Sequence, residues 1–189
     1  MKLAIFGGTF DPIHKGHLAL AHAAAARFEL DRVLLVPAAR PPHKSGVTHA
    51  PYGDRVAMAE LAVEGEARFE VSRLEEHTAR SYSIYTIDQV RASLAADDEL
   101  YFLIGADAFA ELQTWYRWRD VVKCVRFLVV SRPGHLYQAP EGAQFDRIDD
   151  LEVPISSSDI RRAIAAGERP AGLAETVRAY IEARGLYRN

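Results

Sequence analysis

Histidines and glycines that could bind a phosphate gather near the start of the chain, in the run Gly7-Gly8-Thr9-Phe10-Asp11-Pro12-Ile13-His14-Lys15-Gly16-His17. This run follows a short apolar strand pattern, Leu3–Phe6, and leads into an alanine-rich helical pattern. A strand, a glycine turn and a helix N-terminus direct backbone N–H groups at one point, where a phosphate can bind. His14 and His17 share a helix face at this spacing and add imidazole donors. The alternative is a tight turn followed by surface histidines, but the complete run favours a phosphate site.

Other kinds of site are excluded or disfavoured by spacing. The chain has no Gly-x-x-x-x-Gly-Lys-Ser/Thr P-loop, and no Gly-x-Gly-x-x-Gly dinucleotide motif follows the first strand. A zinc site formed by His14, His17 and His22 is a weak alternative, because no carboxylate has zinc-binding spacing and the three histidines do not line one helix face.

Two polar segments follow predicted strands. In the loop 37–44, prolines fix an extended chain that could present Lys44, and with it Arg40, to a phosphate; the alternative is a solvated connection. After the strand pattern Leu100–Ile104, Gly105 allows a ligand to approach closely and Asp107 could accept hydrogen bonds from ribose hydroxyls. For Asp107 the alternative is an ordinary helix N-cap.

Aromatic and hydroxyl side chains form two more candidates. Ser81-Tyr82-Ser83 precedes a helical pattern, where the serines could simply cap the helix. Adjacent aromatics in Thr114-Trp115-Tyr116 point in different directions, so one can pack while the other offers its face to a flat ring. Core packing of both rings is the alternative.

A second anion site is predicted near the C-terminal part. Three hydroxyls at positions 156–158, the N–H groups of a helix start and Arg161 one turn later could bind a polyphosphate. Ser156 and Asp159 also have the spacing of a capping box, which is the structural alternative. Arg132, which follows the fifth strand pattern, could reach the same polyphosphate.

The elements that position these residues alternate between strand and helix. Strand patterns are Leu3–Phe6, Arg32–Val36, Phe69–Ser72, Leu100–Ile104, Arg126–Ser131 and a weaker one near Arg147–Leu151. Helical patterns are Gly16–Phe28, Gly53–Val63, Ile84–Leu94, Ser158–Ala166 and a last helix that ends at Gly185. We therefore expect one domain over residues 1–189, an α/β fold with a doubly wound, mainly parallel sheet and a helical C-terminal part. Its ligand should lie at the carboxyl ends of the strands.

Composition narrows the class of protein. A net charge of −3 argues against non-specific nucleic-acid binding, and no apolar stretch approaches the ~20 residues that span a bilayer. Cys124 is a single cysteine, so no intramolecular disulfide forms. The start of the chain has no signal-peptide pattern, and we expect a cytoplasmic protein.

The run from Gly7 to His17 resembles the His-x-Gly-His signature of a nucleotidyltransferase superfamily, in its nicotinate mononucleotide adenylyltransferase variety. Pro41-Pro42-His43-Lys44, Ser81-Tyr82-Ser83 and Trp115-Tyr116 resemble the segments that mark this branch. Residues 155–161 resemble its Ile-Ser-Ser-Thr-x-Ile-Arg. Three positions depart from the pattern: Arg80 stands for proline, and Ser83 and Ser158 stand for threonine.

The resemblance implies transfer of the adenylyl group of ATP to nicotinate mononucleotide, with release of pyrophosphate. His14, His17 and Arg161 are the implied catalytic residues. The residues implied to bind ATP are Gly7, Gly8, Thr9, Phe10, Gly105, Asp107, Arg132, Ser156 and Ser157. Those implied to bind the mononucleotide are Lys44, Tyr82, Ser83, Trp115 and Tyr116. Mg²⁺ would arrive with ATP, and no metal site of the protein is implied.

Alternatives remain open within and beyond this class. A related adenylyltransferase could act on nicotinamide mononucleotide or phosphopantetheine, and a non-catalytic nucleotide-binding regulator could share the fold. The sequence also leaves a homo-oligomer open.

Overall fold

The computed structural model describes residues 1–41, 48–131, 137–149, 151 and 153–188. Six strands form one sheet: β1 Lys2–Gly8, β2 Arg32–Pro37, β3 Phe69–Val71, β4 Glu99–Gly105, β5 Arg126–Val130 and β6 Phe145–Ile148. The helices are α1 Lys15–Arg27, α2 Tyr52–Ala62, α3 Ser83–Ala92, α4 Ala106–Ala110, the 3₁₀ helix η1 Leu112–Thr114, α5 Trp118–Cys124, α6 Ser157–Ala165 and α7 Glu175–Arg184.

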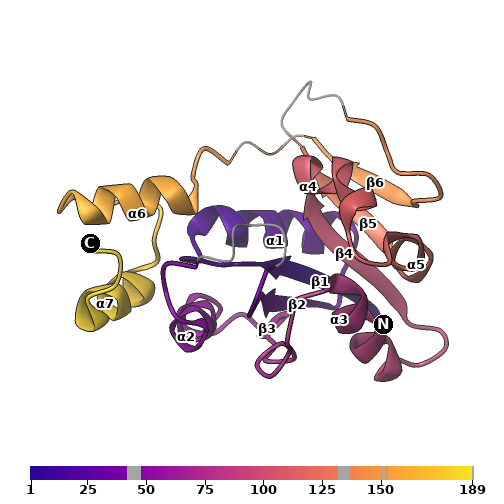
Figure 1. The fold of residues 1–189 in the computed structure, drawn as a ribbon, viewed down its shortest axis with the longest axis horizontal. Coiled ribbons are helices and arrows are strands. Elements are labelled where there is room, and N and C mark those ends of the chain that lie inside the picture. Colours follow the sequence, from indigo (N-terminus) through magenta and orange to yellow (C-terminus); the bar gives the residue numbers. More distant parts are fainter. Residues whose placement is uncertain (42–47, 132–136, 150, 152, 189) are drawn as a thin grey trace.

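The sheet has the strand order β3-β2-β1-β4-β5-β6, and every pair of neighbours is parallel. The order reverses between β1 and β4, which lie side by side although α1, α2 and α3 separate them in sequence (Figure 1). Loops that leave β1 and β4 at such a switch point diverge and leave a crevice at the carboxyl edge of the sheet. The predicted doubly wound α/β fold is confirmed.

Alternation along the strands produces two apolar cores. In β1, Ala4 and Phe6 pack in a cluster that includes side chains of α1, α2 and α7, whereas Leu3 and Ile5 pack with side chains of α3, α4 and α5. Both faces of the central strands are therefore covered, as parallel sheets require. No helix in the described ranges is long and apolar enough to cross a membrane.

The C-terminal helices α6 and α7 lie together at one end of the molecule, beside the C-terminus and opposite α5 and β6 (Figure 1). Their predicted bounds agree with the structure to within one residue for α6, and Gly185 ends α7 in a left-handed conformation at φ +64°. The 3₁₀ helix η1 and the short helices α4 and α5 did not emerge from the sequence patterns.

The sixth strand begins earlier than the sequence predicts, at Phe145 instead of Arg147. The ring of Phe145 packs on Phe109, with centroids 5.3 Å apart, and Asp146 forms an ion pair with Arg126 of β5. These contacts fix the start of the strand two residues before the pattern that predicted it.

Cys124, the last residue of α5, is half-buried.

Candidate active site

The histidine motif joins β1 to α1 at the carboxyl edge of the sheet. His14 is the N-cap of α1, and its backbone N–H donates to Nδ1 of His17 at 3.2 Å. The two imidazole rings stack, with centroids 3.7 Å apart. The edge of Phe10 also packs against His17, at 5.1 Å between centroids. The structure therefore brings the two predicted histidines together at a helix N-terminus.

His14 is buried, with 6% of its surface exposed, and its Nδ1 has no hydrogen-bond partner in the described part of the chain. Burial lowers the pKa of His14 to about 4, because the charged ring loses its hydration. At neutral pH His14 is thus an uncharged imidazole with an unused polar atom, which suits a group that meets its partner only when ligand is bound.

Gly16 stands between the histidines for a steric reason. A Cβ at this position would lie 2.3 Å from Cγ1 of Val153 and 2.9 Å from Nδ1 of His14. Any larger residue would displace the catalytic candidate His14 or the segment at Val153, so the glycine allows this close packing.

The segment 9–12 that precedes the histidines is held from α2. Arg55 is fully buried and donates from Nη1 to the carbonyl of Thr9 at 2.6 Å and from Nε to the carbonyl of Ala50 at 3.2 Å. Burial lowers the pKa of Arg55, and the negative charge of Asp11 opposes this change. The guanidinium of Arg55 and the carboxylate of Asp11 are therefore both buried beside the phosphate-binding candidate and interact electrostatically.

Helix α6 holds the same segment from the other side. Arg161 donates from Nη1 to the carbonyl of Asp11 at 2.7 Å and from Nη2 to Oγ of Ser158 at 3.3 Å. Ser157 donates its hydroxyl to the carbonyl of Pro12 at 2.9 Å. Segments almost the length of the chain apart thus meet at one site, which brings Arg161 to the histidine motif as predicted.

Ser156 is the N-cap of α6, as the capping-box alternative proposes. Its Oγ accepts from the N–H of Asp159 at 3.1 Å and donates to Oδ2 of Asp159 at 2.7 Å. Since the hydroxyls of Ser156 and Ser157 are engaged, a phosphate at this helix would meet backbone N–H groups first.

An aromatic hollow of about 300 Å³ opens on the β2 side of the motif. Tyr116 stacks on Tyr82, with ring centroids 4.6 Å apart, while Trp115 packs its edge against Phe102 at 6.0 Å. Tyr116 is the more exposed ring of the pair, at 46%, so the alternative in which both rings belong to the core does not hold. The hollow is lined by Gly8, Thr9, Tyr82, Ser83, Trp115 and Tyr116, among others.

The serine-capping alternative for this region is wrong. Tyr82 is the N-cap of α3 and no side chain caps that helix end. Ser81 instead joins the neighbouring loop, because its Oγ accepts from the N–H of Arg40 at 2.8 Å and its N–H donates to the carbonyl of Arg40 at 3.1 Å. The buried carboxylate of Glu75 reinforces this link by accepting from Thr86 and from the N–H of Ala39.

A second hollow of about 310 Å³ opens beyond β4, lined by Gly105, Asp107, Ser131 and Leu20 of α1, among others. A Cβ on Gly105 would meet nothing within 4 Å, so the space before it is open. Gly105 itself is the N-cap of α4, and Asp107 is the second residue of that helix, so the N-cap alternative for Asp107 is wrong. Helix α4 lines both hollows, with Ala108 in the aromatic one and Asp107 in this one.

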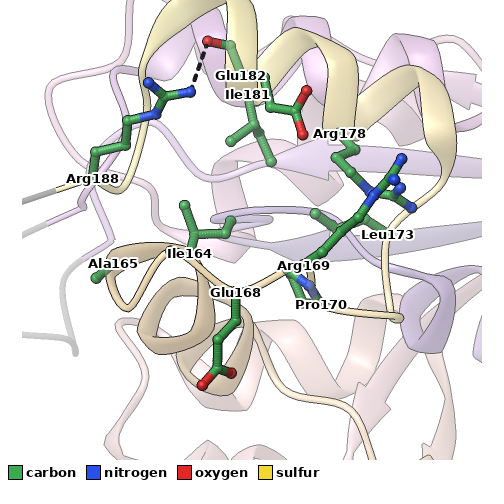
Figure 2. A pocket seen from close by; sticks show the side chains of 11 residues that line it. Ile164, Ala165, Glu168, Arg169, Pro170, Leu173, Arg178, Ile181, Glu182 and Arg188 are labelled. Atoms are coloured by element: carbon green, nitrogen blue, oxygen red, sulfur yellow. Dashed lines mark hydrogen bonds between the residues drawn. The ribbon is translucent and has the colours of Figure 1, made fainter.

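A larger hollow of about 580 Å³ lies between α6 and α7 (Figure 2) and contains none of the predicted site residues. Arginine side chains point into it, but Glu175 already pairs with Arg169 at 3.0 Å and with Arg178 at 2.8 Å. Arg188, the third arginine that lines it, donates to the backbone carbonyl of Glu182 at 3.5 Å.

Two predicted residues, Lys44 and Arg132, lie outside the described residues. Sequence reasoning missed the roles of Asp11, Arg55 and Glu75. Asp11 stood inside the quoted motif, and the only sign of Arg55 was a charged residue on the apolar face of a helical pattern. No group of three or more His, Cys, Asp or Glu residues suited to a metal ion occurs within the described ranges.

Comparison with known proteins places this site in a family. The family model described as "Cytidylyltransferase-like" matches residues 5–163. The "Probable nicotinate-nucleotide adenylyltransferase" of Solibacter usitatus is 70% identical over 187 residues, which cover 99% of this chain and all (100%) of that protein. A protein of the same description from Gloeobacter violaceus is 40% identical over 198 residues, covering 98% and 96%.

Solved structures show the same fold. The Plasmodium falciparum nicotinic acid mononucleotide adenylyltransferase complexed with NaAD superposes with a TM-score of 0.80 at 19% identity, covering 98% of this chain and 97% of that one. Together with the full-length match to the Solibacter protein, these findings show that the chain belongs to the nicotinate-nucleotide adenylyltransferases of the cytidylyltransferase-like superfamily.

Proposed function

We propose that the chain transfers the adenylyl group of ATP to nicotinate mononucleotide, giving nicotinate adenine dinucleotide and pyrophosphate in NAD biosynthesis. The observation that carries the proposal is the arrangement of two hollows, one lined by Gly8 and Thr9 of the histidine motif and the other by Leu20 of the helix that the motif begins, with α4 lining both. Such an arrangement suits two substrates whose phosphates must meet at the motif.

The aromatic hollow is the proposed seat of the mononucleotide. Tyr82, Trp115 and Tyr116 line this hollow, so their rings are the surfaces against which the pyridine would pack. Ser83 is the first residue of α3, so its N–H and hydroxyl can both donate to the carboxylate that distinguishes nicotinate from nicotinamide. Lys44 would address the mononucleotide phosphate.

The hollow beyond β4 is the proposed seat of adenosine. Gly105 allows close approach, and the carboxylate of Asp107 is placed to accept from ribose hydroxyls. The triphosphate, carried as its Mg²⁺ complex, would extend across Gly7, Gly8 and the backbone of Thr9 and Phe10 to the N-terminus of α6. There the backbone N–H groups of Ser156 and Ser157, with the side chains of Arg161 and Arg132, would hold the β- and γ-phosphates.

Adenylyl transfer of this kind requires that the enzyme position the phosphates and stabilise their charge, and it does not require a general base. A phosphate monoester has a second pKa near ~6, so at pH 7 the attacking oxygen is already mostly deprotonated. The barrier is then repulsion between anions and misalignment, which preorganised donors lower.

The two histidines supply such donors in defined states. Because Nδ1 of His17 accepts from His14, a neutral His17 carries its hydrogen on Nε2, from which it can donate to the α-phosphoryl group. His14, neutral at pH 7, donates one N–H without bringing a charge into the buried site. The bonds of Arg161 to Asp11 and Ser158 use two of the five N–H donors of a guanidinium, so others can meet the leaving pyrophosphate.

The test is product formation by the purified protein with ATP and Mg²⁺ and three acceptors in parallel: nicotinate mononucleotide, nicotinamide mononucleotide and phosphopantetheine. We expect dinucleotide and pyrophosphate in equal amounts, with kcat/KM highest for the nicotinate form. A preference for another acceptor would replace the substrate but keep the reaction class. No pyrophosphate with any acceptor would favour a nucleotide-binding regulator and refute the proposal.

Where the reaction takes place follows from the same proposal. A biosynthetic enzyme that consumes ATP fits the cytoplasm, as expected from the sequence, and fractionation of cells that produce the chain would check it.

A further inference from the structure

Tyr187, near the C-terminal end, contacts the loop that carries the histidine motif. Its hydroxyl donates to Oδ1 of Asp11 at 2.7 Å, across 176 positions of sequence. Gly185 makes this contact possible, because its left-handed conformation ends α7 and turns the chain back. The next residues are fixed along α7: the N–H of Leu186 donates to the carbonyl of Ile181 at 3.1 Å, and Arg188 reaches the carbonyl of Glu182 at 3.5 Å (Figure 2).

The carboxylate that receives this hydroxyl is almost completely buried, with Asp11 4% exposed. Its other partners are the N–H groups of His49 at 2.7 Å and Ala50 at 3.1 Å, with Nδ1 of His49 at 3.4 Å. Burial, followed by the hydrogen bond to Asp11, raises the pKa of Tyr187 far above its usual value, so the hydroxyl keeps its proton and donates at every working pH.

Both ends of the contact have unusual backbone conformations. Tyr187 has φ +62° and Phe10, adjacent to Asp11, has φ +47°, although neither is glycine. Such conformations persist where the surroundings hold them, and they gather at sites whose geometry matters for function.

The loop held by Tyr187 is the one on which the proposed catalytic groups depend. The carbonyl of Asp11 accepts from Arg161, and two residues after Pro12 the chain reaches His14, the N-cap of α1. A shift of Asp11 would therefore change the placement of Arg161 and of the histidine pair together.

We propose that Tyr187 is a positioning residue for adenylyl transfer: acting through the carboxylate of Asp11, it holds the segment 9–12 in the conformation that aligns His14, His17 and Arg161 on the phosphates. This inference rests on the proposed function. It assigns to the C-terminal segment a role in the rate of the reaction and none in acceptor recognition, because Tyr187 does not line the aromatic hollow.

The chain offers a matched control in Tyr180 of α7. Its hydroxyl donates to Oδ1 of Asp54 at 2.8 Å, so it forms the same kind of tyrosine–aspartate bond to a buried carboxylate. Asp54 lies on α2, and its hydrogen-bond partners Tyr180 and Arg184 both belong to α7 and not to the histidine loop. Tyr180→Phe and Tyr187→Phe each remove one hydroxyl, but only the second should affect the chemistry.

The experiment compares these two variants with the unaltered chain by steady-state kinetics and thermal unfolding. We expect Tyr187→Phe to lower kcat by about 10- to 100-fold, as small misplacements of reacting groups do. Its KM for nicotinate mononucleotide should stay within about twofold, and Tyr180→Phe should keep both constants within about twofold. Wild-type kcat in Tyr187→Phe, or equal kcat losses in both variants, would overturn the proposal.

Asp11→Asn supplies a second arm. If the hydroxyl acts through the carboxylate, Tyr187→Phe should lower kcat much less in the Asp11→Asn background than in the unaltered chain. If the two substitutions lower kcat by factors that simply multiply in the double variant, Tyr187 does not act through Asp11. Should Asp11→Asn fail to fold, the comparison of the two tyrosine variants decides by itself.

A substrate-free measurement separates this inference from the proposed function. In long-range ¹H–¹⁵N spectra of the imidazoles, Tyr187→Phe should shift the signals of His14 and His17, and Tyr180→Phe should not. If the unaltered chain makes no dinucleotide yet these signals shift, the function is wrong and the positioning stands. If it turns over and Tyr187→Phe keeps its spectrum and its kcat, the positioning is wrong and the function stands.

Discussion

The region around the histidine motif and the region around the aromatic hollow are held in place by different means. Residues 9–17 are fixed by buried polar contacts from distant parts of the chain, with Arg55 of α2, Arg161 of α6 and Tyr187 all bonded to one short segment. The aromatic hollow depends on ring contacts, such as the stack of Tyr82 on Tyr116, and Tyr116 is half-exposed.

This difference matches what each region has to do. Stabilising charge on a phosphoryl group requires donors that do not move as the reaction proceeds, and buried hydrogen bonds to a folded framework provide that rigidity. Stacking on a flat ring tolerates small displacements, because dispersion forces depend weakly on direction. The protein therefore concentrates long-range hydrogen bonds at the motif and aromatic contacts at the proposed acceptor site.

The largest loss of activity should follow from a substitution within the histidine motif. His17→Ala is expected to lower kcat by about 10²- to 10³-fold, the usual loss when one donor to a developing charge is removed. His22→Ala is the control, because His22 lies on the same helix, is 52% exposed and pairs with Glu66. Thermal unfolding should show both variants folded, and near-normal turnover by His17→Ala would remove the motif from the chemistry.

The buried state of His14 predicts an acid sensitivity of the rigid region. The unfolded chain binds a proton at this imidazole below about pH 6.5, but the folded chain does so only near its pKa of about 4. The contribution of His14 to the free energy of unfolding is therefore fully present above pH 6.5. It falls by up to about 3 kcal/mol as the pH drops from 6.5 to 4. Urea unfolding at several pH values measures how the free energy of unfolding depends on pH, and His14→Gln should weaken this dependence between pH 6.5 and 4. The same pH dependence in His14→Gln and in the unaltered chain would mean that burial does not lower the pKa of His14.

Packing around the motif can be tested with two glycines. Gly16→Ala should lower the free energy of unfolding by about 1–3 kcal/mol and reduce kcat, because the new Cβ meets Val153 and His14. Gly53→Ala in α2, where a Cβ meets nothing within 4 Å, should instead stabilise by ~0.4–1 kcal/mol. Chemical denaturation of the pair checks the contrast, and a Gly16→Ala variant as stable and active as the parent would argue against a tightly packed motif.

The smallest effect is expected in the aromatic hollow. Tyr116→Ala should raise KM for nicotinate mononucleotide by about 2- to 12-fold, corresponding to a ring contact of ~0.5–1.5 kcal/mol, and leave KM for ATP unchanged. Leu74→Ala is the control, since Leu74 is an exposed apolar side chain, at 37%, that does not line the hollow. Equal changes in both variants, or a change in KM for ATP, would move the acceptor elsewhere.

The strands, and the position of most candidate site residues at one edge of the sheet, could be predicted from the sequence because both depend on local patterns. Apolar runs such as Leu3–Phe6 mark buried parallel strands, and the glycines and polar residues that follow them mark the carboxyl edge where His14, Tyr82, Gly105 and Trp115 meet. Short elements are harder to predict from such patterns, because α4 and α5 have too few residues for a helical period to stand out.

The long-range polar contacts could not be predicted for a different reason. Nothing in the order of residues pairs Tyr187 with Asp11, or buries Arg55 beneath Thr9, because these contacts depend on how α2, α6 and α7 close around the sheet. They are properties of the assembled fold, so the residues that position the motif became visible only in three dimensions.

Helix α4, although only five residues long, forms part of the wall of both hollows. A displacement of this helix that improves the fit of one ligand also changes the shape offered to the other. Thermodynamic linkage then requires that each ligand alter the affinity for the other by the same factor. With the two substrates in the proposed hollows, this one helical turn is the shared wall through which the binding of one would be coupled to the binding of the other.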